Sequence, residues 1–286
     1  QSLIFLHSMN YFLRGVAFAL PLAVFLHPTS PADSKQAEPP RCQPIGRIIS
    51  SQNPKLPRGS LVCADQIVAS AKSPQSTTLL CWNGTILTTK DLNASTIARS
   101  CSTTPKDPMK FCSSDQDSFC IRPRGSSAIS LRFLSPIGYT ILDTRPQLAW
   151  TPIDLAEKYI VQIRGNDVAF QTTTVKPSLD YPAQLPSLTP GNTYQVTIST
   201  TRNSERLTVR TVIRVLDHEQ TQTLNRTIAQ IRQLNLNPDE QALDLARVYK
   251  ARNLIHNAVQ VLEARVRSGS QDSRVQATLT QLLKLS

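Results

Sequence analysis

The stretch Asn237-Pro-Asp-Glu-Gln-Ala-Leu-Asp-Leu-Ala-Arg-Val-Tyr-Lys250 has the clearest helical pattern in the chain. Asn237 can cap a helix, Pro238 suits the first helical position, and two acidic residues follow in the first turn. Apolar residues then recur three and four positions apart, which is the period of one helix face. The same period begins at about Asp217 and continues to the end of the sequence. Four short antiparallel helices are therefore predicted over residues 216–286.

Part of this helical region resembles a tetratricopeptide repeat, which is a 34-residue pair of antiparallel helices. Between Asp239 and Asp272 the small and bulky packing positions of that repeat are occupied by Leu245, Ala246, Tyr249, Asn253, Leu254, Ala258 and Leu262. Arg265 and Ser270 depart from the pattern, which usually has Ala and Pro there. A second repeat begins at Ser273 with its first helix. Such units need neighbours, so we expect the preceding helix to cap the array, or the helices to pack on the sandwich or on a partner.

The repeat resemblance implies that the helical region docks a partner helix or peptide in the groove between its helices. By analogy, Arg247, Lys250 and Asn253 would meet acidic groups of the partner. Val248 and Leu254 would add apolar contact. If the end of the last helix were bare, it would expose an adhesive apolar surface made of three leucines, namely Leu279, Leu282 and Leu283.

Upstream, residues 126–215 alternate short β-rich runs with turns, at a spacing that fits a small antiparallel sandwich. Strands are predicted over 147–150, 159–163, 168–171 and 194–198. The run Leu188-Thr-Pro-Gly-Asn-Thr-Tyr194 resembles the fibronectin type III pattern, in which a Leu, a turn Pro and a Tyr form a tyrosine corner. Trp150, Tyr159 and Tyr194 are expected to be core residues, with their polar tips satisfied locally.

All six cysteines lie further upstream, in residues 42–125, and are Cys42, Cys63, Cys81, Cys101, Cys112 and Cys120. No Cys-x-x-Cys pair is present, so disulfides are favoured over a zinc site. Short strands are predicted over 46–49, 60–63, 66–69, 77–81 and 85–88. Between the last two, Asn83-Gly84 predicts a hairpin with a type I′ turn, in which both central residues have positive φ.

Three features of this cysteine-rich region resemble the FecR-like exported β domain that precedes repeat arrays in some bacterial, notably cyanobacterial, proteins. They are Leu56-Pro-Arg-Gly-Ser-Leu61, the run from Leu79 to Thr85, and Cys101. The resemblance implies a disulfide between Cys81 and Cys101, with Cys112 and Cys120 as the next candidate pair. Cysteine spacing by itself leaves every connectivity open.

The first 32 residues read as a signal peptide, with Met9 as a plausible start. Arg14 precedes an apolar run over 15–26, which is shorter than the roughly 20 residues that span a bilayer. Ser30-Pro-Ala32 places small residues where a signal peptidase cleaves. A Pro-rich linker over 33–41 follows. These features predict a periplasmic or extracellular protein with no transmembrane segment after signal removal.

The net charge of +11 is unevenly distributed along the chain. Residues 1–125 carry 13 Lys/Arg and 7 Asp/Glu, residues 126–201 carry 5 and 5, and residues 202–286 carry 13 and 8. The basic residues are scattered singly, without an aromatic-interleaved strip or a recognition-helix pattern, so nucleic acid is not an expected partner. A basic surface does suit an anionic envelope polymer, which is the second candidate partner after a protein or peptide.

Residue patterns for catalysis are few. His218 and His256 lie on predicted helices without a convincing partner, and His256 is expected at a helix surface. Asp115 and Asp117 form the densest acidic cluster, which we interpret as a solvated loop. The common hydrolase, nucleotide-binding and calcium-loop motifs are missing from the sequence, so no enzyme activity, cofactor or metal is predicted.

The sequence therefore predicts a multidomain protein: an all-β N-terminal part, made of a disulfide-bearing β domain and a sandwich, followed by a helical tail. The favoured function is a non-catalytic scaffold of the cell envelope that docks a partner through the tail. Three alternatives remain: an envelope glycan or polyanion binder that uses the basic β domain, a periplasmic signalling sensor, and an accessory subunit of an exported enzyme.

Overall fold

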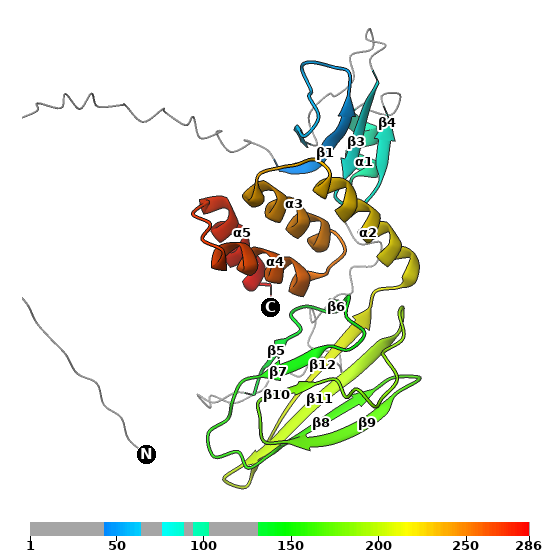
Figure 1. Ribbon diagram of the computed structural model, residues 1–286. Helices are drawn as coiled ribbons and strands as arrows, with labels where there is room; N and C mark the ends of the chain where they lie inside the picture. The colour runs from blue at the N-terminus through cyan, green and yellow to red at the C-terminus, as the bar shows by residue number, and fades with distance from the viewer. Residues whose placement is uncertain (1–42, 64–75, 89–93, 103–130, 286) are drawn as a thin grey trace, which may run out of the picture. The chain divides into compact units, whose positions relative to one another are not determined.

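The computed structural model describes residues 43–63, 76–88, 94–102 and 131–285, coloured from blue to red in Figure 1. Several predictions fall outside these ranges: the signal peptide over 1–32, the linker over 33–41, the strand over 66–69, and the residues Cys42, Cys112, Cys120, Asp115 and Asp117. Within the described ranges, strands fill the N-terminal part and helices fill the C-terminal part, which confirms the coarse fold class.

The first described region is a four-stranded antiparallel sheet in the order β2-β1-β3-β4. Its strands are β1 (Pro44–Ser51), β2 (Leu61–Cys63), β3 (Thr77–Cys81) and β4 (Ile86–Thr88). Helix α1 (Ala94–Ser100) follows the sheet and was not predicted, because seven residues are too few to show a helical period. Its Ile97 packs with Ile48, Val62 and Leu79 in a small buried cluster that also contains Cys81 and Cys101.

The hairpin between β3 and β4 is confirmed, but its predicted type I′ turn is wrong. Gly84 has a φ of +86°, whereas Asn83 is not among the residues with positive φ. The amide of Gly84 donates to the carbonyl of Cys81, and the amide of Cys81 donates to that of Thr85, both at 2.9 Å. This is a three-residue loop, in which a type I turn is followed by a left-handed glycine.

Residues 131–215 form a sandwich of two sheets, as the strand spacing predicts. One sheet has the order β10-β7-β5 and the other β6-β12-β11-β8-β9 (Figure 1). The strands are β5 (Phe133–Ser135), β6 (Thr140–Ile141), β7 (Gln147–Trp150), β8 (Tyr159–Arg164), β9 (Ala169–Thr174), β10 (Ser178–Asp180), β11 (Thr193–Arg202) and β12 (Glu205–Val215). Alternate residues of the strands point into one core between the sheets.

The three aromatic residues singled out in the sequence lie in this core. Trp150 and Tyr159 meet edge to face, with ring centroids 5.3 Å apart. The hydroxyl of Tyr194 accepts a hydrogen bond from the amide of Thr189 at 2.8 Å, which is the bond expected of a tyrosine corner. The same hydroxyl donates to Asp167 at 2.8 Å. The Trp150 indole nitrogen, however, has no hydrogen-bond partner within the described part of the chain, so for this residue the expectation of a satisfied polar tip is wrong.

Four helices follow, as predicted: α2 (His218–Arg232), α3 (Pro238–Lys250), α4 (Ile255–Arg267) and α5 (Ser273–Leu283). The side chain of Asn237 caps α3 by accepting the amide of Glu240 at 2.9 Å. Asp217 and Asp272 cap α2 and α5 in the same way. Consecutive helices contact each other, and α5 also contacts α3.

The helices are not a separate tail. One buried cluster joins Leu80 of β3 and Trp82 of the following turn to residues in and next to the helices. These are Leu216 before α2, Leu224, Ile228 and Ile231 of α2, Leu245 and Val248 of α3, and Leu254 before α4. On the other side, α4 contacts β6 of the sandwich. The sequence left open whether the preceding helix or another domain would cover the repeat. In the structure α2 packs against α3, and both β regions also contact the helices.

Candidate functional site

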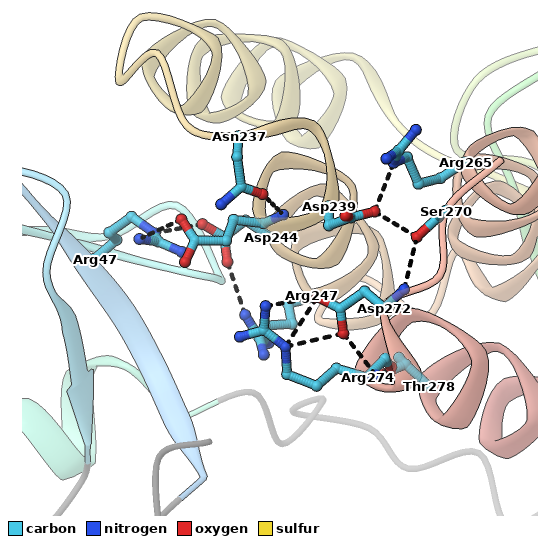
Figure 2. A network of polar contacts seen from close by, with 11 residues as sticks. Arg47, Asn237, Asp239, Asp244, Arg247, Arg265, Ser270, Asp272, Arg274 and Thr278 are labelled. Carbon is cyan, nitrogen blue, oxygen red and sulfur yellow. Dashed lines mark hydrogen bonds and ion pairs between the residues drawn. The ribbon is translucent and has the colours of Figure 1, made fainter. Parts of the chain in front are cut away.

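Helix α3 carries a carboxylate that is completely enclosed between the helices and the first sheet. Asp244 has no exposed surface, and Arg47 of β1 donates from Nε to its Oδ2 at 2.5 Å. Arg247, one turn further along α3, donates to Oδ1 at 2.7 Å. Figure 2 shows both arginines converging on this carboxylate. Both oxygens of a buried charge are thus occupied by charge-assisted hydrogen bonds, as such a group requires.

Arg47 is itself almost fully buried, with 4% of its side chain exposed. It also donates to the carbonyl of Gly59, and Glu240 lies 4.0 Å from it. Burial raises the pKa of Asp244, although the two arginines act in the opposite direction. Burial lowers the pKa of Arg247, while Asp244 acts against that shift. Each charge is tolerated here because the other is present.

The turn of the first sheet adds a second anchor on the same helices. Arg252, just after α3, donates to the carbonyls of Trp82 and Asn83 at 3.1 and 3.0 Å. The guanidinium of Arg247 lies over the Trp82 ring, 5.7 Å from its centroid. A Cβ atom at Gly84 would lie 2.8 Å from Cγ2 of Thr223 and 2.9 Å from Oγ1 of Thr227, so a side chain would push the turn away from α2. This close approach and the φ of +86° explain why glycine occupies the position.

These contacts change the reading of the predicted partner-binding residues. Val248 and Leu254 are completely buried and contact the protein's own core, so their contact with a partner stays a prediction that would require this packing to open. Arg247 meets an internal acid, Asp244, where a partner's acid was expected. Lys250 is exposed and Asn253 is half-buried with a φ of +58°, and their partner role stays a prediction. The spacing of apolar residues shows that one face of α3 is buried, but it does not show which surface covers that face.

The two departures from the repeat pattern prove to be connected. Arg265 donates to Oδ1 of Asp239 at 2.6 Å, and the hydroxyl of Ser270 donates to the same oxygen at 2.5 Å. The Ser270 hydroxyl also accepts the amide of Asp272, which caps α5 and pairs with Arg274 at 2.6 Å (Figure 2). The hydrogen bonds from Arg265 and Ser270 lower the pKa of Asp239. This chain of polar contacts ties the start of α3 to the end of α4 and the start of α5.

The last helix leaves part of the predicted apolar end uncovered. Leu282 is 1% exposed and packs against α4, and Leu279 is partly buried beside it, so neither belongs to a bare helix end. Leu283 is 42% exposed, and Leu285 beyond the helix is 56% exposed. Leucines that are adjacent in sequence thus face inward and outward, because successive residues of a helix are about 100° apart.

His218 and His256 belong to different helices, α2 and α4. His218 is exposed at the start of α2, as expected. His256 was expected at a helix surface, but it is half-buried, and its Nδ1 lies 3.4 Å from the amide of Ile137 in the sandwich. Burial lowers its pKa. Within the described ranges, no group of three His, Cys, Asp or Glu side chains is placed to hold a metal ion.

Two observations bear on the compartment. Cys81 and Cys101 form a disulfide, as the family resemblance implied, and Cys63 is disulfide-bonded as well. Disulfides persist mainly in oxidising compartments. None of the described helices has the length and apolarity to cross a membrane.

No protein-family model matches this sequence, and no curated protein matches it either.

Proposed function

We propose that this chain is an exported, non-catalytic interaction protein of the cell envelope, in which two β modules support a short helical array that docks a partner. The proposal includes the three resemblances: a FecR-like domain over 42–125, a fibronectin type III-like sandwich over 126–215 and a tetratricopeptide-like region over 216–286. The observation that carries it is the uncovered flank of α5. There, Leu283 and Leu285 stay exposed beside helices whose other large apolar residues are buried or partly buried.

The internal anchoring of α3 supports this reading. The buried ion pair between Arg47 and Asp244 and the shared apolar cluster hold the first helices against the first sheet. The face of α3 that carries Val248 is therefore covered by other residues of the same chain, including Leu80 and Trp82. Docking is left to surfaces that remain open, namely the outer flank of α5 and the exposed Lys250. In a stack of helix pairs, the flank of the last helix is where a further helix packs.

The test is affinity capture from the envelope fraction of the source organism, with the mature chain immobilised. The double variant L283E/L285E places two charges on the flank of α5. Its matched control is L134E/V175E, which alters two exposed apolar residues of the sandwich that are 49% and 74% exposed. We expect a partner that the wild-type chain and the control retain and that L283E/L285E loses.

Retention of the same partner by all three chains would place docking elsewhere and contradict the proposal. Thermal unfolding of each variant is the folding check. All four substituted residues are exposed, so the melting temperatures should change little.

A further inference from the structure

The outer face of the five-stranded sheet gathers arginines that are far apart in the sequence. On β12 the outward positions alternate with the core positions Ile213 and Val215, so Arg206, Arg210 and Arg214 share one face. Strand register carries this face across the sheet: Thr197 of β11 opposes Arg210 and also pairs with Gln162 of β8. Arg164, two residues from Gln162, therefore lies on the same face.

Most of these arginines have no internal partner. Arg164, Arg206 and Arg210 are exposed, and none of them forms an ion pair within the described ranges. Arg214 is 3.9 Å from Asp217, with 42% of its side chain exposed. No outward position of β8, β9, β11 or β12 is acidic. The face thus carries a net positive charge.

The spacing of the arginines forms a row. Arg206, Arg210 and Arg214 are four residues apart along one strand, which places their Cα atoms about 13 Å apart. Between them and across the sheet lie amide and hydroxyl side chains, including Gln195, Thr197 and Thr208. The row therefore places positive charges about 13 Å apart, with hydrogen-bonding amide and hydroxyl groups between them.

A recess opens at one end of the row. It has a volume of about 490 Å³ and is lined by Arg206, Lys158, Thr201, Ser204 and Leu155, together with Glu157, Ile160, Ser199, Thr200 and Asn203. Leu155 is 74% exposed, so the recess has an apolar wall beside its hydroxyl and cationic groups. A sugar ring also combines an apolar face with hydroxyl edges.

We propose that this face binds a linear polysaccharide that carries carboxylate or sulfate groups. One sugar unit enters the recess beside Arg206 and Lys158, and the acidic groups of the following units meet Arg210 and Arg214 along β12. The inference is independent of docking through α5, because it uses different residues and a different ligand.

The composition of the face favours a glycan over other polyanions. The outward positions of these strands carry no aromatic side chain, so they offer nothing for nucleic acid bases to stack on. Leu155 is the one strongly exposed apolar residue lining the recess, which is too little for insertion into a lipid surface. Amides and hydroxyls, by contrast, match the hydroxyl groups of sugars.

The experiment measures binding of the full chain to polygalacturonate and to dextran sulfate, with uncharged dextran, duplex DNA and phosphatidylglycerol vesicles as comparison ligands. The first variant is R206Q/R210Q. Its control, R226Q/R232Q, removes the same charge from exposed positions on α2. We expect R206Q/R210Q to weaken binding of one or both acidic glycans about tenfold, whereas the control changes it less than twofold.

A second variant, T201W, fills the recess without changing the charge. We expect it to weaken glycan binding about tenfold as well, since the recess is part of the site. Equal weakening by R206Q/R210Q and R226Q/R232Q would show unspecific attraction by net charge and overturn the proposal. Tighter binding of DNA or vesicles than of either glycan at equal ionic strength would overturn it too.

Discussion

The sandwich over residues 131–215 builds its core from its own two sheets, whereas the four-stranded sheet over residues 44–88 relies on other elements. The sandwich cluster contains residues from β6, β7, β8, β11 and β12 and includes Trp150 and Tyr194. The cluster on one side of the first sheet is much smaller and includes two cysteines of a disulfide. On its other side, Leu80 and Trp82 are covered by helices.

This difference follows from size. A small sheet cannot bury enough apolar surface to stabilise itself, so such domains depend on disulfides or on packing against another element. The first sheet uses both, and the contact with α3 includes a buried ion pair that the sandwich does not need. We therefore expect substitutions to affect the two β regions differently. A substitution in the first sheet should destabilise the sheet together with the helices, whereas a substitution in the sandwich should destabilise the sandwich alone.

The largest effect is expected from Asp244→Ala. This substitution leaves Arg47 buried without its carboxylate, which we expect to lower the free energy of unfolding by about 3–5 kcal/mol. Chemical unfolding followed by tryptophan fluorescence would measure it, since Trp82 lies beside Arg247 and Trp150 lies in the sandwich. The unfolding of the Trp82 region should shift to lower denaturant while that of Trp150 changes little.

Two further variants test whether the unpaired buried charge causes the loss of stability. Arg47→Met, Asp244→Leu and Arg247→Met together remove all three charges of the cluster and should recover most of the lost stability. Glu263→Ala breaks the exposed pair with Arg267, whose side chain is 70% exposed, and should change stability by less than about 1 kcal/mol. A small effect of Asp244→Ala would mean that the contact between β1 and α3 does not hold in solution.

The second effect concerns the disulfide between Cys81 and Cys101, which are 20 residues apart. Replacing both by alanine should destabilise the first sheet by about 3 kcal/mol, because the unfolded chain gains freedom. Differential scanning calorimetry would show the loss in the transition that includes the helices. If the sandwich transition moved by the same amount, the separation of the two β regions would be wrong.

The smallest effect is expected in the sandwich. Tyr194→Phe removes a hydroxyl that binds both Thr189 and Asp167, and should cost about 1–2 kcal/mol. Calorimetry should show the loss in the sandwich transition alone. Asp167→Asn keeps an acceptor for the tyrosine and should cost less. An equal loss in both transitions would instead indicate that the sandwich and the helices unfold as one unit.

Local patterns were sufficient for much of the fold. The cap at Asn237, the strand at 194–198 and the hairpin near Asn83 were predicted correctly, because each depends on residues adjacent in the sequence. The turn type at Asn83 was not, since Asn-Gly suits more than one hairpin loop. The helix over 94–100 was missed because its seven residues carry too weak a periodic signal.

The candidate sites were harder to predict. The row on β12 has a local signal, Arg206-x-x-x-Arg210-x-x-x-Arg214, which becomes informative once the strand and its inward face are known. The charge totals for 126–201 and 202–286 do not show the row, because the boundary between these segments falls inside the sandwich, just before β12. Its extension to Arg164 depends on strand register, which sequence spacing alone does not give.

Residue patterns along the chain are enough to predict the four C-terminal helices, most strands and the order of the regions, because periodicity and capping act over a few neighbouring residues. The contact of Asp244 with Arg47, 197 residues away, and the burial of Val248 and Leu254 result from packing between elements that are distant in the sequence. An amphipathic helix shows that one face will be buried, but not what buries it. That choice depends on which surfaces meet once the chain has folded.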